Sequence, residues 1–105
     1  MSMSTHILDT SRGKPAAGVT IRLEACQDGQ WRELMTGRTN QDGRLGGWST
    51  EHAGAYRLIF DTGGYLGPDA FYPEVIVEFR VADPDEHYHV PLLISPFGYS
   101  TYRGS

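Results

Sequence analysis

Apolar and polar residues alternate with a period of two along much of this chain. In residues 19–25, an apolar side chain occupies every second position, and polar side chains lie between them. Residues 56–60 and 75–81 repeat this alternation. Successive side chains of a β-strand point to opposite faces of its sheet, so this period predicts strands with one buried face.

Turn-forming residues separate further strands. The Asp-Gly pair at 28–29 is typical of a hairpin, and residues 31–35 can return as its second strand. Residues 40–43 form another turn that also ends in Asp-Gly. An Asp-Pro-Asp turn at 83–85 precedes a strand that we expect over residues 87–94.

Short strands are also expected near the ends of the chain, over residues 5–10 and 99–102. No segment carries a sustained helical stripe, and residues 61–67 favour at most one short helical turn because glycine weakens helices. Seven to eight short strands with frequent turns predict an all-β fold, an antiparallel β-sandwich. The length of 105 residues fits a single domain over 1–105, which can bury about 65% of its unfolded surface.

The strand over residues 87–94 is apolar on both faces. His89 shares its face with Pro91 and Leu93, although the opposite face already supplies the core. In the first strand, His6 shares its face with Leu8 in the same way. Either histidine alone is more often structural, but apolar residues around both favour a ligand or another subunit as the partner of these faces. The core face consists of Tyr88, Val90, Leu92 and Ile94.

The composition argues against several partners and locations. The formal charge of −4 disfavours nucleic acid, which binds basic surfaces. The single cysteine, Cys26, cannot form an internal disulfide and favours a reducing compartment. The first residues lack the basic and apolar regions of a signal peptide, and no stretch is long enough to span a membrane. We therefore expect a cytoplasmic protein with no membrane partner.

Other chemistry has weaker signals in this sequence. The familiar zinc spacings are missing, and although His87 and His89 can chelate a metal from one strand face, a solvated strand start is the favoured interpretation. Cys26 has no evident histidine partner, so we exclude it as a nucleophile. Arg44 follows the Asp-Gly turn at 42–43, where an arginine is usually solvated but can also bind carbonyl oxygens or an oxyanion.

Three stretches of the chain resemble the transthyretin-like proteins. Residues 4–10 (Ser-Thr-His-Ile-Leu-Asp-Thr) with 13–16 (Gly-Lys-Pro-Ala) resemble the opening of that family, and residues 39–44 (Thr-Asn-Gln-Asp-Gly-Arg) resemble its second block. Residues 87–96 (His-Tyr-His-Val-Pro-Leu-Leu-Ile-Ser-Pro) resemble its third block. The closing Tyr-Arg-Gly-Ser at 102–105 marks the enzymatic branch, the 5-hydroxyisourate hydrolases, and transthyretin, the thyroid-hormone carrier, lacks it.

The resemblance implies a site and an assembly. The family's catalytic positions fall on His6, Arg44 and His89, and other residue types occupy these positions in the carrier branch. A transthyretin-like sandwich is expected to form a homotetramer, a dimer of dimers, whose sites lie at subunit interfaces. No metal or organic cofactor is expected. Besides His6 and Arg44, the implied substrate-binding residues are Tyr102, Arg103, Gly104 and Ser105.

The implied reaction is hydrolysis of 5-hydroxyisourate to 2-oxo-4-hydroxy-4-carboxy-5-ureidoimidazoline in urate catabolism, toward allantoin. Two histidines can act as base and acid at neutral pH, and His6 and His89 share these roles in an order that the sequence leaves open. Arg44 would stabilise the oxyanion. Arg103 would attract an anionic substrate, and Ser105 would orient a histidine or the water. The alternatives are a non-enzymatic carrier of small ligands, whose deep channel the bulky Tyr102 would close, and a purely structural β-domain.

Overall fold

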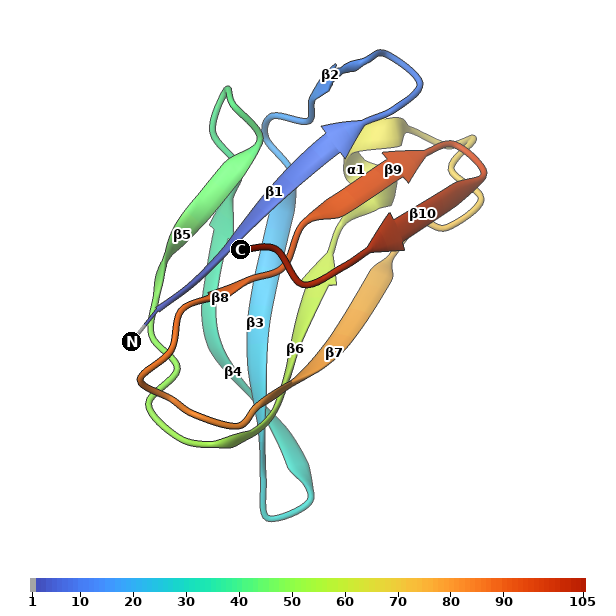
Figure 1. Cartoon of the computed structure of the whole chain (residues 1–105). Helices are drawn as coiled ribbons and strands as arrows, with labels where there is room; N and C mark the ends of the chain where they lie inside the picture. Colours follow the sequence, from blue (N-terminus) through green and yellow to red (C-terminus); the bar gives the residue numbers. More distant parts are fainter. Residues whose placement is uncertain (1) are drawn as a thin grey trace.

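The computed structural model describes residues 2–105, which form two β-sheets that face one another (Figure 1). The predicted all-β sandwich with a single short helix is confirmed. The helix, α1 (Thr62–Leu66), lies in the segment where one helical turn was expected. The first sheet contains β1 (Met3–Asp9), β2 (Lys14–Pro15), β5 (Arg44–Trp48), β8 (Tyr88–His89), β9 (Leu92–Ser95) and β10 (Gly98–Thr101); the second contains β3 (Thr20–Gln27), β4 (Gln30–Arg38), β6 (Gly54–Phe60) and β7 (Val75–Val81).

The strand β1 lies at the centre of the first sheet. Its first half pairs with β5 on one side and β8 on the other, and its second half pairs with β2 and β9. The pairs of β1 with β8 and β9 are parallel, whereas the sequence predicted antiparallel strands throughout. Parallel neighbours require a long connection, and here the whole second sheet lies between β1 and β8 in the chain.

The second sheet is antiparallel, in the order β4-β3-β6-β7. The predicted hairpin joins β3 to β4 through a two-residue turn, with Gln27 opposite Gln30. Asp28 (φ 55°) and Gly29 (φ 78°) both adopt positive φ. Positive φ at both central residues defines the turn type that matches the twist of a hairpin.

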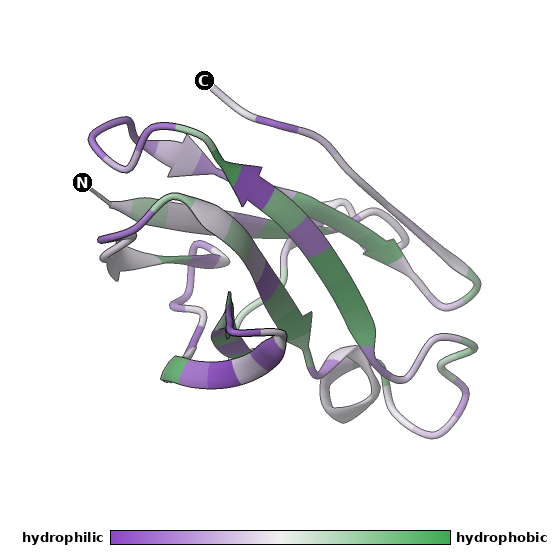
Figure 2. Cartoon of the chain, turned by 90° about the horizontal axis from the view of Figure 1, so that it is seen from below, coloured by the Kyte–Doolittle hydropathy of each residue, from purple (hydrophilic) through white to green (hydrophobic). Residues whose placement is uncertain are grey.

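The alternation in the sequence correctly predicted which side chains form the core. Ile21 and Leu23 of β3 and Leu58 and Phe60 of β6 are fully buried. Apolar and polar positions alternate visibly along the strands in Figure 2. The predicted core face of residues 87–94 is also buried between the sheets.

The strand pattern differs from the prediction in two places. The expected strand over 87–94 is divided into β8 and β9, because Pro91 between them has no N–H to donate to a neighbouring strand. The strand β5 was not expected, since its sequence, Arg-Leu-Gly-Gly-Trp, shows no alternation and contains two glycines, which are depleted in strands. The helix of the described chain is too short and too polar to cross a membrane.

Candidate active site

The outward face of β1 brings together groups from three strands. Residues of β1 are alternately buried and half-buried, with Ser4, His6 and Leu8 on the half-buried, outward side. His6 lies opposite Arg44 of β5, and Ser4 lies opposite His89 of β8. Cross-strand partners project from the same face of a sheet. The three residues proposed as catalytic therefore share one outer face.

A turn of defined geometry places Arg44 beside β1. Gly43 has a φ of 73°, and a Cβ there would lie 2.5 Å from the carbonyl oxygen of Ile7. The Ile7 N–H donates to the Gly43 carbonyl (2.8 Å), and the Arg44 N–H donates to Oδ1 of Asn40 (3.0 Å). Only glycine allows this approach, so the Asp-Gly turn fixes the start of β5 and leaves the Arg44 side chain exposed.

His89 is held on two sides. Its Nδ1 lies 2.8 Å from Oγ of Ser4. The Gly104 N–H donates to the His89 carbonyl (2.8 Å), so the end of the chain pairs with β8 (Figure 1). A Cβ on Gly104 would lie 2.5 Å from Cδ2 of His89 and 3.4 Å from Cγ of Pro91. The tail therefore lies directly against the imidazole ring, and Pro91 is buried although its face was predicted to meet solvent, a ligand or another subunit.

The surroundings of His89 favour its neutral form. Burial lowers the pKa of His89 below its ordinary value, and the positive charges of Arg44, His87 and His6 lower it further. A hydrogen bond to the Ser4 backbone acts in the opposite direction. With a lowered pKa, the imidazole stays unprotonated at neutral pH and can accept a proton.

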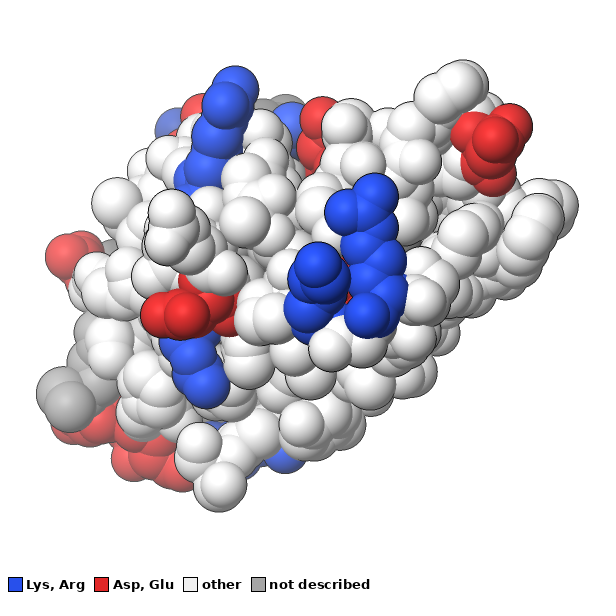
Figure 3. All heavy atoms as spheres, turned by 90° about the horizontal axis from the view of Figure 1, so that it is seen from above, with Lys and Arg blue, Asp and Glu red and all other residues white. Residues whose placement is uncertain are grey.

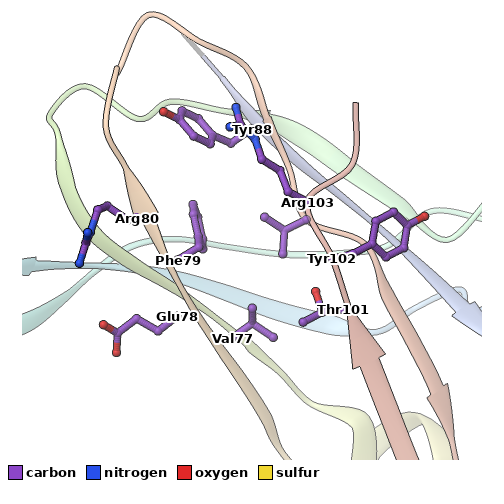
Figure 4. Close-up of a pocket in the computed structure, with 9 residues that line it drawn as sticks. Val77, Glu78, Phe79, Arg80, Tyr88, Thr101, Tyr102 and Arg103 are labelled. Carbon is purple, nitrogen blue, oxygen red and sulfur yellow. The ribbon is translucent and has the colours of Figure 1, made fainter.

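The remaining tail side chains alternate in direction (Figure 4). Tyr102 is 60% exposed. Arg103 points away from it: its guanidinium lies 4.7 Å from the centre of the Tyr88 ring, and Nη2 lies 3.4 Å from Oε1 of Glu86. Both tail residues line a cavity of about 340 Å³ beside the edge strand β7. Ser105 is exposed, and Gly104 is the tail residue that pairs with His89.

Ser4 and Ser2 contact the histidines of β8 and of the segment before it, which the sequence did not predict. Ser4 Oγ lies 3.2 Å from Nε2 of His87, and Ser2 Oγ lies 2.9 Å from its Nδ1. The period of two in the sequence predicts that Ser4 and His6 share one face. It does not predict that Ser4 contacts a strand far away in the chain. Both ring nitrogens of His87 thus have serine partners. Within residues 2–105, no group of three histidine, cysteine or acidic side chains is arranged to hold a metal ion.

The lone cysteine and the surface charges lie away from this face or show no pattern of their own. Cys26 lies in β3 of the second sheet, opposite Trp31. Basic and acidic side chains are interspersed on the face seen in Figure 3. A nucleic-acid site would require a basic stripe there.

The chain is similar in sequence and in structure to 5-hydroxyisourate hydrolases and to a transthyretin. A protein of Salmonella typhimurium called 5-hydroxyisourate hydrolase is 52% identical over 98% of this chain and 80% of its own length. The solved structure of Klebsiella pneumoniae 5-hydroxyisourate hydrolase is 38% identical, covers 100% of both chains and has a TM-score of 0.85. Sea bream transthyretin, solved in complex with thyroxine, is 35% identical over 97% of this chain and 93% of its own, with a TM-score of 0.89.

The family model described as HIUase/Transthyretin matches residues 3–104, which include all ten strands of the described chain and the site on β1, β5 and β8. The transthyretin-like sandwich that the sequence implied is therefore confirmed, and the chain belongs to the HIUase/Transthyretin family.

Proposed function

We propose that this chain hydrolyses 5-hydroxyisourate to 2-oxo-4-hydroxy-4-carboxy-5-ureidoimidazoline in urate degradation. The observation that carries the proposal is the meeting of His6, Arg44 and His89 on one outer face, with Gly104 against the His89 ring. Relatives with the name 5-hydroxyisourate hydrolase support the substrate. Two imidazoles and a guanidinium can supply the base, the acid and the oxyanion stabilisation that the opening of a cyclic amide with water requires.

In the proposed mechanism, His89 is the general base and His6 the general acid. His89 takes a proton from water, whose oxygen forms a bond to the amide carbonyl carbon of the substrate ring. Arg44 stabilises the negative charge that develops on the carbonyl oxygen. The carbon–nitrogen bond then breaks, and His6 protonates the leaving nitrogen. The lowered pKa of His89 supports this order, because the base must be unprotonated at neutral pH.

The tail is proposed to complete the site. Gly104 supports the His89 ring, and the exposed Tyr102 closes the depth of the substrate pocket. In the single chain, Arg103 is engaged by Glu86 and Tyr88. Its attraction for an anionic substrate, and the orienting role of Ser105, stay predictions.

The proposed assembly is a homotetramer, a dimer of dimers, with each site completed at a subunit interface. Leu8 and Leu93 are cross-strand partners on the same outer face as His6, and both are only half-buried in one chain. Apolar groups beside polar catalytic ones fit a face that is partly an interface. A cytoplasmic location is proposed from the single cysteine.

A carrier of small ligands is the second candidate. The TM-score of 0.89 to a thyroxine-bound transthyretin means that the fold alone does not separate the two functions. The titratable groups of the site favour the hydrolase, since a carrier has no need of two imidazoles and a guanidinium directed at one ligand.

The test of the proposed function is a spectroscopic assay. 5-Hydroxyisourate is generated from urate with urate oxidase, and its ultraviolet decay is followed with and without the protein. We expect a decay much faster than the spontaneous one. An unchanged decay rate, with a shift in intrinsic fluorescence on adding an aromatic ligand, would instead support the carrier.

Gly104→Ala is expected to lower kcat about 10-fold to 100-fold, because the new methyl group must displace the His89 ring from its catalytic position. Gly98→Ala is the matched control, since a Cβ there meets only Ser95 Oγ, at 3.8 Å. Steady-state kinetics on both variants measures the difference. Equal activity of the two variants would show that close packing of the tail on His89 is dispensable.

A further inference from the structure

A chain of hydrogen bonds runs away from the candidate site along one end of the first sheet. His89 Nδ1 lies 2.8 Å from Ser4 Oγ, which lies 3.2 Å from His87 Nε2. His87 Nδ1 in turn lies 2.9 Å from Ser2 Oγ. His89 and Ser4 are half-buried, whereas His87 is exposed. The chain thus connects the proposed base with solvent.

Strand pairing in the first sheet positions the groups of this hydrogen-bonded chain. Ser4 is the parallel partner of His89, and the Val90 N–H donates to the Ser4 carbonyl (2.9 Å). Ser4 Oγ therefore lies beside the imidazole as a result of strand pairing. The contact with Ser4 Oγ engages Nδ1 of His89, so we expect Nε2 to be the ring nitrogen that meets a substrate or water.

We infer that Ser4 is a positioning residue that holds the His89 proton on Nδ1 and leaves the lone pair of Nε2 free for the substrate water. In a neutral imidazole one nitrogen donates and the other accepts, and the hydrogen bond of one nitrogen decides the state of the other. Ser4 Oγ then accepts from His89 Nδ1–H. The role of His89 as base rests on the proposed function, whereas the Ser4 contact does not.

The hydrogen bonds of the whole chain are compatible with this tautomer. When His89 Nδ1–H donates to Ser4, the Ser4 hydroxyl is free to donate to His87 Nε2, and His87 Nδ1–H donates to Ser2 Oγ. In this direction each of these three donors has an acceptor. The charged or titratable groups that act on His89 are Arg44 of β5, His6 of β1 and the neighbouring His87.

The test compares a pair of nearly isosteric variants, Ser4→Thr, which keeps the hydroxyl, and Ser4→Val, which does not. Nitrogen NMR of labelled protein at mildly alkaline pH reports the tautomer of each histidine. We expect wild type and Ser4→Thr to protonate His89 on Nδ1, and Ser4→Val to move a large share of the proton to Nε2. In Ser4→Val, kcat should fall about 10-fold to 100-fold with KM little changed.

Ser100→Ala serves as a control, because Ser100 lies on the same face but opposite Leu93 of β9, whereas His89 of β8 lies opposite Ser4. A His89 proton on Nε2 in wild type, or the same tautomer and kcat in Ser4→Val as in Ser4→Thr, would overturn the inference. Failure of wild type to accelerate 5-hydroxyisourate decay would refute the proposed function alone, since the NMR comparison needs no turnover. Should Ser4→Val fold poorly, Ser4→Ala supplies the same comparison with less bulk.

Discussion

His89→Ala is expected to lower kcat/KM for 5-hydroxyisourate by about 10²–10⁴-fold, the usual contribution of a general base. The side chain is half-buried on the outer face and outside the core, so the variant should fold and assemble as wild type does. The ultraviolet assay measures the loss, and size-exclusion chromatography with light scattering checks the assembly.

His52→Ala is the matched control for this prediction. His52 is exposed, and its hydrogen bonds to the Tyr56 hydroxyl use only its backbone. It should keep wild-type activity. Turnover of His89→Ala close to wild type would remove His89 from the mechanism and leave His6 as the only histidine of the site.

Arg44→Ala is expected to lower kcat about 10²–10³-fold, as the loss of one oxyanion-stabilising group does elsewhere. Arg44→Lys should restore only part of the rate, because an ammonium group lacks the planar fork of a guanidinium. Steady-state kinetics distinguishes this outcome from a pure binding defect, which would raise KM and leave kcat unchanged.

The same substitution has a consequence for His89. The charge of Arg44 disfavours the imidazolium, so removing it should raise the pKa of His89 toward its ordinary value. NMR titration measures this shift, and the acid limb of the pH–rate profile should move to higher pH by the same amount. Arg38→Ala, an exposed arginine of β4 in the second sheet, controls for net charge. An unchanged His89 titration in Arg44→Ala would mean that the two groups are not coupled.

Local patterns predicted the buried faces correctly and the strand pairing incompletely. In β3, β6 and β7, apolar and polar residues alternate along the sequence. The apolar residues of this alternation face the core. The strand β5 escaped prediction because Gly46 and Gly47 interrupt any pattern, and it forms because Gly43 can approach Ile7 closely. Hydrogen bonds to β1 stabilise β5, and its own side-chain pattern gives no sign of them.

The candidate site was likewise predicted in part from the sequence. Resemblance to a family placed His6, Arg44 and His89 in one site from sequence, and their positions on outward faces agree with it. The contact of Ser4 with His89 joins residues 85 positions apart. The direction of Arg103, toward Glu86 and Tyr88, likewise depends on where the tail leaves β10.

By itself, the sequence determined the core faces of β3, β6 and β7, where the Asp-Gly turns lie, and which histidines face outward, since all of these depend on residues a few positions apart. The tertiary structure alone decided that β1 lies at the centre of its sheet, parallel to β8, with Gly104 and Ser4 on either side of His89. The physical reason is that strand order and parallel pairing are properties of the whole packed chain, because they bring together segments that no local period relates.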